Sequence, residues 1–423
     1  MTTDQLSPPE PPAVAPQPRR TGLWTQLRPL VLRLHFYAGI LIAPFILIAA
    51  TTGLIYTAAP QIENIVYHDQ LRVPVGDAQL PLSEQVTAAR QAHPSGDIVS
   101  ITPPVSEDSS TRVVFTDDTV REELTKTVFV DPYTADVRGQ ETSLGQWLGV
   151  REWIDTLHRT LHLGAVGRNY SELAASWLWV VVLGGLALWI GRRRSDKRLR
   201  QIVTPDLKKR GRARNLSWHG VIGTWIAVGL LALSVSGLTW SNHAGAKIGD
   251  IRHSFDWNSR PINTSLSDKP ATSGGHDHAH MAEAATAGDD IFTAGVGING
   301  VMATAMSQGL RAPLNITPPA DDTSAWTVAE NKRSAPTRYD AITVDPTTGQ
   351  VVDRVNQSDW PFMAKLSDWI IGAHMGILFG ITNQLILAGL AIGLIVVILR
   401  GYRMWWQRRP TTATGLQMGR PAP

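Results

Sequence analysis

The sequence contains no cysteine, so disulfide bonds, thiolate metal sites and iron–sulfur clusters are excluded. Histidine is therefore the main candidate ligand for a redox metal. Charge is also missing from four long stretches, which no Asp, Glu, Lys or Arg interrupts: residues 34–62, 173–191, 215–246 and 369–399. A hydrocarbon core of roughly 30 Å needs about 20 residues of apolar helix, so each stretch can cross a bilayer.

We therefore predict an α-helical membrane protein with a bundle of four spanning helices, over residues 34–60, 157–191, 215–243 and 366–400. The first helix is expected to stay as an anchor, because its apolar run is longer than that of a cleavable signal peptide. The basic loop 192–214 should face the cytoplasm, which places both termini inside. Such basic flanks explain the net charge of +3, so no nucleic acid is expected as a partner.

Two polar segments, 63–150 and 248–365, are predicted on the extracytoplasmic side. Each contains a strand, a Val-Asp-Pro turn and a second strand, with the turns at residues 130–132 and 344–346. Residues 261–290 are rich in Ser, Thr, Ala and His and should form a flexible insertion. Residues 1–20 are expected to form a disordered cytoplasmic tail, and residues 401–423 a second cytoplasmic tail.

The predicted helices repeat one pattern of histidine and glycine. Glycines follow His35 after 4 and 18 residues, and they follow His219 at the same distances. His158 and His374 each precede a glycine by six residues. We therefore expect two parallel repeats, each made of a helix, an outer β segment and a second helix.

The histidines fall into two tiers. His35 and His219 lie at the cytoplasmic ends of the first and third predicted helices, and His158 and His374 lie at the outer ends of the second and fourth. Each tier can supply two axial imidazoles to a b-type haem. His162, expected one turn below His158 on the same face, is an alternative outer ligand. Hydrogen bonds between helices and a proton path are the other interpretations of such histidines.

Two further features concern metals and nucleotides. His276, His278 and His280 could hold a transition metal loosely, although a flexible tract without a fixed site is the simpler interpretation. No glycine-rich nucleotide fingerprint follows a strand on the cytoplasmic side, so we do not expect NAD(P)H or ATP to bind. The electron donor is therefore not identified by the sequence.

Several short motifs occur in a fixed order over most of the chain: Leu34-His35 with Gly39, Thr52-Gly53, the two Val-Asp-Pro turns, Leu157-His158-Arg159, Trp218-His219 with Gly223, and Ala373-His374. In their order and spacing they resemble the PepSY-associated transmembrane family. The resemblance implies two extracytoplasmic α+β PepSY-like segments and a place in the bacterial cytoplasmic (inner) membrane.

The same resemblance implies an iron-regulated oxidoreductase of the ferric-siderophore reductase type. Two b-type haems would pass electrons across the membrane to a ferric siderophore or another Fe(III) chelate. Carried over by position, His35 and His219 would hold the inner haem, and His158 and His374 the outer one. His162 and the His-rich insertion depart from the family's pattern.

Two other functions are compatible with the sequence. The outer segments could be binding or regulatory modules that the helices merely anchor, in which case the purified protein would show no haem spectrum. A transporter of iron or siderophore would accumulate substrate in sealed vesicles without a reductant. No predicted helix is interrupted by charged residues at mid-membrane, which counts against the transporter.

Overall fold

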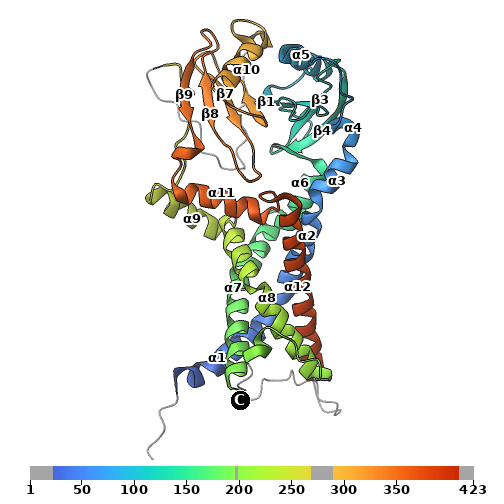
Figure 1. The fold of residues 1–423 in the computed structure, drawn as a ribbon, viewed down its shortest axis with the longest axis vertical. Coiled ribbons are helices and arrows are strands. Elements are labelled where there is room, and N and C mark those ends of the chain that lie inside the picture. The colour runs from blue at the N-terminus through green and yellow to red at the C-terminus, as the bar shows by residue number, and fades with distance from the viewer. Residues whose placement is uncertain (1–21, 196–198, 268–288, 409–423) are drawn as a thin grey trace, which may run out of the picture.

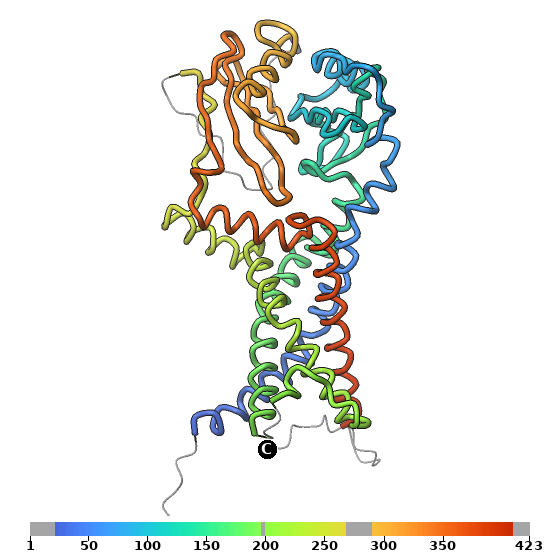
Figure 2. Tube along the Cα trace, in the orientation of Figure 1, coloured from blue at the N-terminus to red at the C-terminus, as the bar shows by residue number. Residues whose placement is uncertain are grey.

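The computed structural model describes residues 22–195, 199–267 and 289–408 of the chain. The predictions for the tail 1–20, for residues 409–423 and for His276, His278 and His280 lie outside these residues. The described chain forms a bundle of long helices with a β-sheet domain at one end (Figure 1). Both ends of the described chain lie at the other end of the bundle (Figure 2).

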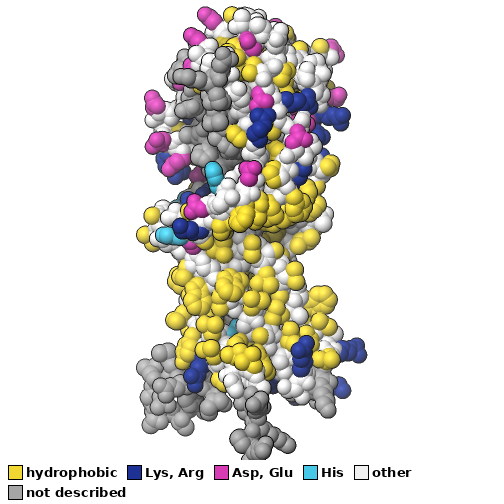
Figure 3. All heavy atoms as spheres, turned by 90° about the vertical axis from the view of Figure 1, so that its left-hand side faces the viewer, with side chains coloured by type: hydrophobic (Ala, Val, Ile, Leu, Met, Phe, Trp, Pro, Cys, Tyr) yellow, Lys and Arg dark blue, Asp and Glu magenta, His cyan; other side chains and the backbone are white. Residues whose placement is uncertain are grey.

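Among the described residues, three helices are long and apolar enough to cross a membrane: α7 (Gly164–Ser195), α8 (Gly211–Thr239) and α12 (Gly380–Trp406). The pair α1 (Leu23–Leu41) and α2 (Ala43–Thr57), bent by 58°, makes a fourth if it is counted as one span. Large apolar side chains stay exposed on the bundle, such as Trp225 at 71% and Val228 at 80%. Figure 3 shows this apolar surface between two zones of charged side chains, as expected of a bilayer-facing surface.

The bend between α1 and α2 has a chemical cause at Pro44. Proline has no N–H to donate to the carbonyl of Ile40, and its ring crowds that carbonyl. The Ile40 oxygen instead accepts a hydrogen bond from the hydroxyl of Tyr402 in α12, 3.1 Å away. The Tyr170 hydroxyl of α7 donates to the carbonyl of Phe45 at 2.6 Å. Side chains of other helices thus fix the bend.

Two predicted spans begin later than the sequence indicated. Residues 157–191 are not one helix, because α6 (Gly149–Thr160) ends before Leu161 and His162, whose φ angles of 52° and 55° are left-handed. The span α7 starts only at Gly164. Residues 366–400 are likewise divided between α11 (Phe362–His374) and α12. His158 and His374 therefore belong to helices that precede the spans.

Shorter helices connect the bundle to the sheet. The third span ends at Thr239, and the expected extension to residue 243 is replaced by a separate helix, α9 (His243–Ser254). Helices α9 and α11 lie across the sheet end of the bundle (Figure 1). The remaining helices of the described chain are α3 (Ala59–Val66), α4 (His68–Leu71), α5 (Leu82–Ala92), α10 (Gly297–Ser307), and the 3-10 turns η1 (Leu199–Ile202), η2 (Asp289–Phe292) and η3 (Gln357–Asp359).

The two polar segments join into a single antiparallel sheet in the order β5-β4-β3-β2-β1-β6-β7-β8-β9. The halves meet where Ile101 of β1 pairs with Ile316 of β6. The sequence predicts two polar segments but does not predict the strand pairing that joins them. The strands are β1 (Ile98–Thr102), β2 (Thr111–Phe115), β3 (Thr125–Val130), β4 (Val137–Leu144), β5 (Trp147–Leu148), β6 (Leu314–Thr317), β7 (Trp326–Glu330), β8 (Ala341–Val344) and β9 (Val351–Val355).

The predicted strand–turn–strand units are confirmed in both halves. One turn joins β3 to β4 and the other joins β8 to β9. Asp131 accepts a hydrogen bond from the amide of Tyr133, and Asp345 accepts one from the amide of Thr347. The aspartate side chain therefore closes each turn, as Asx residues commonly do.

Helices α5 and α10 cover one face of the sheet. Val113 and Phe115 of β2 share a core with Val86 of α5 and Val301 of α10. Because side chains alternate along a strand, Arg112, directly before Val113, points to the opposite face. That face borders a cavity between the sheet and the bundle. On the same face Phe129 of β3 packs on Leu71 of α4, so the helix-free part of this face is the part over β1, β2 and β6, above the ends of the long helices.

Candidate functional site

His35 of α1 and His219 of α8 form a pair in the half of the bundle away from the sheet. Their ring centroids lie 6.3 Å apart and their planes cross at 79°. Nδ1 of His35 lies 3.0 Å from the carbonyl oxygen of Val181, and Nδ1 of His219 lies 2.9 Å from that of Val397. A carbonyl only accepts hydrogen bonds, so both Nδ1 atoms carry a proton and both Nε2 atoms keep a lone pair.

His158 of α6 and His374 of α11 line one cavity at the sheet end of the bundle. Nδ1 of His158 lies 3.0 Å from the hydroxyl of Thr52, and Nδ1 of His374 lies 2.6 Å from that of Ser236. Each hydroxyl donates its own proton to a carbonyl four residues earlier in its helix. Its oxygen is left to accept, so Nδ1 carries the proton here as well.

The second ring nitrogen is available in all four histidines. Within the described parts of the chain, none of the four Nε2 atoms takes part in a hydrogen bond. Metal-ligating histidines have this arrangement, with one nitrogen fixed by an acceptor and the other directed to the metal. Hydrogen bonding between helices explains the Nδ1 contacts but gives no reason for four oriented lone pairs.

Glycines lie against the four rings, and at Gly185 and Gly53 an added Cβ would crowd the imidazole. Distances from an added Cβ to the nearest imidazole carbon, Cε1, are 2.9 Å for Gly185 and His35, 3.6 Å for Gly401 and His219, 3.1 Å for Gly53 and His158, and 3.8 Å for Gly237 and His374. A Cβ added at Gly39 or Gly223 would meet no described atom within 4 Å. The glycines one turn from the first histidine pair therefore border open space.

The prediction that His162 lies one turn below His158 is wrong. The helix ends at Thr160, and His162 follows in a left-handed turn with φ of 55°. Its ring packs instead against Trp153, with centroids 4.9 Å apart. The change of backbone direction turns His162 away from the face that carries His158.

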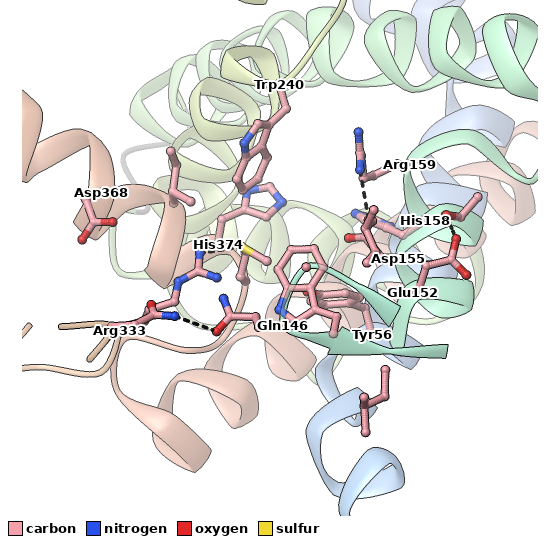
Figure 4. A pocket seen from close by; sticks show the side chains of 18 of the residues that line it. Tyr56, Gln146, Glu152, Asp155, His158, Arg159, Trp240, Arg333, Asp368 and His374 are labelled. Carbon is pink, nitrogen blue, oxygen red and sulfur yellow. Dashed lines mark hydrogen bonds and ion pairs between the residues drawn. The ribbon is translucent and has the colours of Figure 1, made fainter. Parts of the chain in front are cut away.

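A cavity of about 1490 Å³ extends from the helix-free sheet face into the bundle. His158 and His374 line it together with two aromatic residues, Tyr56 and Trp240. The Tyr56 ring lies 6.3 Å from that of His158, and the Trp240 ring lies 5.3 Å from that of His374. Figure 4 shows Trp240 beside His374 in this pocket. Deeper lining residues such as Leu394 are apolar, so the cavity joins a polar chamber to an apolar interior.

Carboxylates around the cavity are held in ion pairs. Asp155 pairs with Arg159 at 3.1 Å, and Glu152 pairs with Arg121 at 3.1 Å. Burial raises the pKa of Asp155, and the neighbouring Arg159 opposes that shift. Burial likewise raises the pKa of Asp368 in α11. Asp155 and Glu152 are therefore structural charges and not free ligands.

No group of three or more His, Asp or Glu side chains that could hold a metal ion occurs in the described ranges. The rings of His35 and His219 lie together, and His158 and His374 line one cavity. Two ligands are too few for a protein-bound zinc or calcium ion, but they match the two axial positions of a haem iron.

The sequence profile described as the PepSY-associated TM region matches residues 32–408. The chain belongs to the PepSY-associated transmembrane family. The matched residues include all four paired histidines and every strand of the sheet. The family membership also supports a membrane location for the long helices. Among curated proteins, none matches the chain.

Sequence reasoning missed the groups that orient the histidines in this PepSY-family protein. Thr52 and Ser236 each directly precede a glycine that packs on the same ring, which was the available signal. The carbonyls of Val181 and Val397 carried no signal, because every residue has a carbonyl. The contacts of Tyr56 with His158 and of Trp240 with His374 were not predicted either.

Proposed function

We propose that this protein is a transmembrane haem-b electron-transfer protein that reduces a ferric siderophore or another Fe(III) chelate on the sheet side of the membrane. The observation that carries the proposal is the state of the four histidines. Each has Nδ1 fixed by a neighbouring helix and a lone pair left on Nε2. Haem would supply one-electron chemistry at these positions.

The spacing of the first pair suits a sandwiched haem iron. Two metal–imidazole bonds of about 2 Å, with roughly 1 Å more from each nitrogen to its ring centre, give about 6 Å between centroids. The centroids of His35 and His219 lie 6.3 Å apart. Gly39 and Gly223 border open space next to this pair. A flat macrocycle needs such room between helices.

The second pair has the same chemistry in a different setting. His158 and His374 would hold the second haem, with the apolar part of the cavity around it. Gly53 and Gly237 lie against the two rings. His162 is not required, because its ring packs on Trp153. We therefore propose two haems per chain, each with one histidine from each half of the chain.

Equal sequence offsets support two parallel repeats. An offset of 184 residues relates His35 to His219, Thr52 to Ser236, Gly53 to Gly237 and Tyr56 to Trp240. An offset of 216 residues relates His158 to His374, Val181 to Val397 and Gly185 to Gly401. Related residues make related contacts in the two halves.

The proposed orientation places the sheet outside a bacterial cytoplasmic membrane and both termini in the cytoplasm. Basic residues concentrate in the loop 192–214 and near residues 400–409, at the end away from the sheet. One histidine pair then lies toward each membrane surface. A hydrocarbon layer of roughly 30 Å is thereby divided into shorter distances for an electron.

The proposal is tested by electron transfer across a sealed vesicle. Proteoliposomes carrying the haem-loaded protein would enclose dithionite, and a ferrous chelator outside would report Fe(II) formed from Fe(III) citrate. We expect Fe(II) outside only with the protein, and a loss of this signal in His35→Ala and in His374→Ala. His68→Ala, an exposed histidine beside Asp69, is the control. A fully haem-loaded protein that leaves Fe(III) unreduced would refute the function.

A further inference from the structure

One face of the sheet contributes polar side chains to the wall of the cavity. Side chains on its helix-free face include the hydroxyls of Ser100, Thr102 and Thr127, the amide of Asn315 and the guanidinium of Arg112. The opposite face is apolar and packs on α5 and α10. A polar strand face that is enclosed above a pocket, instead of facing open water, is suited to a polar ligand.

Arginines in the cavity outnumber the carboxylates that could neutralise them. Four lining acids have close partners, through the ion pairs Arg121–Glu152, Arg159–Asp155 and Arg338–Glu330 and the contact of Glu172 with His243. Glu123 and Asp368 also line the cavity, and the charge of Arg333 acts on the carboxyl of Asp368. Four lining arginines have no carboxylate within 4.0 Å among the described residues: Arg112, Arg168, Arg252 and Arg333. Among the described residues, seven arginines and six carboxylates line the cavity, and these four arginines lie outside its close ion pairs.

Two of these arginines lie on the sheet side. Arg112 of β2 is half-buried and lies over the Phe129 ring at 5.8 Å, and burial lowers its pKa, with Glu63 attracting it from beyond ion-pair distance. Arg333, between β7 and β8, is 9% exposed. A guanidinium nitrogen of Arg333 lies 3.8 Å from the sulfur of Met375, and its guanidinium carbon lies 6.0 Å from the centre of the Trp147 ring.

A buried guanidinium without a close carboxylate is costly, and such a group is suited to bind an anion. The planar fork of arginine matches a carboxylate with two parallel hydrogen bonds. Figure 4 shows Arg333 and His374 in the same pocket, so an anion held there would lie near the histidine pair. The cavity of about 1490 Å³ exceeds the roughly 300–1,000 Å³ of ordinary ligand sites, which leaves room for a chelate besides a cofactor.

We propose that Arg112 and Arg333 bind the carboxylates of an anionic Fe(III) chelate, of the citrate type, in preference to a neutral or cationic hydroxamate chelate. The proposal rests on the proposed function and names its substrate class. Reduction adds one electron to the chelate, converts Fe(III) to Fe(II), makes no covalent bond and leaves the chelate one charge more negative. The two arginines therefore attract the product state more strongly than the substrate state.

The test is a binding measurement that needs no electron transfer. Ga(III) citrate mimics the ferric chelate but cannot be reduced, and isothermal titration calorimetry with the full chain in neutral detergent gives its Kd. We expect Ga(III) citrate to bind and the cationic Ga(III) complex of desferrioxamine B to bind at least tenfold more weakly. Removing a charged hydrogen bond should raise the Kd about 10- to 100-fold in Arg112→Gln and in Arg333→Gln.

Arg260→Gln is the matched control, because Arg260 lies on the same domain but pairs with Asp353 outside the cavity. Its Kd should equal that of the wild type. If Arg333→Gln fails to fold, Arg112→Gln alone decides the outcome. Equal affinity for both gallium complexes, or an unchanged Kd in Arg112→Gln, would overturn the proposal.

Haem propionates also carry carboxylates, so haem per chain is counted in the same samples. Unchanged haem with a raised Kd supports a chelate site, whereas lost haem would assign these arginines to the cofactor and overturn the proposal. The proposed function fails separately. If the protein binds citrate but contains no haem, the electron-transfer function is refuted and the anion site is supported. If reduction depends on haem but shows no preference for citrate, the anion site is refuted and the electron-transfer function is supported.

Discussion

Removing the hydroxyl of Thr52 should loosen the cofactor at the sheet-side histidines without changing the fold. Thr52→Val keeps the shape of the side chain but removes the oxygen that accepts a hydrogen bond from Nδ1 of His158, 3.0 Å away. Such outer partners of ligating histidines are worth roughly 10- to 100-fold in metal affinity. We therefore expect one of the two proposed haems to dissociate about tenfold or more faster than in the wild type.

The same substitution should change the reduction potential of that haem. A histidine that donates from Nδ1 is more basic at Nε2 and so favours the ferric state. A net hydrogen bond of about 0.5–1.5 kcal/mol corresponds to roughly 20–65 mV for one electron. Spectroelectrochemical titration should show one midpoint potential of Thr52→Val higher by this amount, with the other unchanged.

The neighbouring threonine supplies the control. Thr51 is exposed, and its hydroxyl donates only to the carbonyl of Leu47 in its own helix at 2.8 Å. Thr51→Val therefore removes the same group from the same helix without touching an imidazole. If both variants lose haem equally, or if neither potential moves in Thr52→Val, the role assigned to the hydroxyl is wrong.

Two further predictions concern packing and pH. Gly185→Ala would place a Cβ 2.9 Å from Cε1 of His35, whereas Gly184→Ala would place one 3.6 Å from the Cβ of the same residue; only the first should lose a haem, and equal haem counts would contradict this. Burial raises the pKa of Asp368, so the folded state binds this proton more tightly than the unfolded chain. Stability should therefore fall as pH rises from about 4 towards the raised pKa, and thermal unfolding of Asp368→Asn should show a flatter pH dependence. An unchanged slope in that variant would refute the assignment.

The sequence predicted the features that depend on composition and short-range order. Charge-free stretches located the long helices, because a buried charge in lipid is expensive whatever the fold. The Val-Asp-Pro turns were predicted correctly, since Asp131 and Asp345 close them through hydrogen bonds to nearby amides. The histidine spacings brought His35 and His219 to one level, and the structure places their rings together.

The features that were missed depend on tertiary contacts or on backbone direction. Pairing of Ile101 with Ile316 joins strands more than 200 residues apart, and periodicity within either segment carries no information about it. The left-handed turn at Leu161 and His162 interrupts an otherwise helical pattern. Leucine rarely adopts this conformation, so the pattern did not indicate where the helix ends. His162 was consequently assigned to the wrong face.

The most direct test of two haems held by the four histidines is a pyridine haemochrome assay that counts haem per chain. The account predicts two haems in the wild type, one in His35→Ala, one in His374→Ala and two in the exposed control His68→Ala. A wild-type protein without haem, or histidine variants that keep both haems, would contradict it.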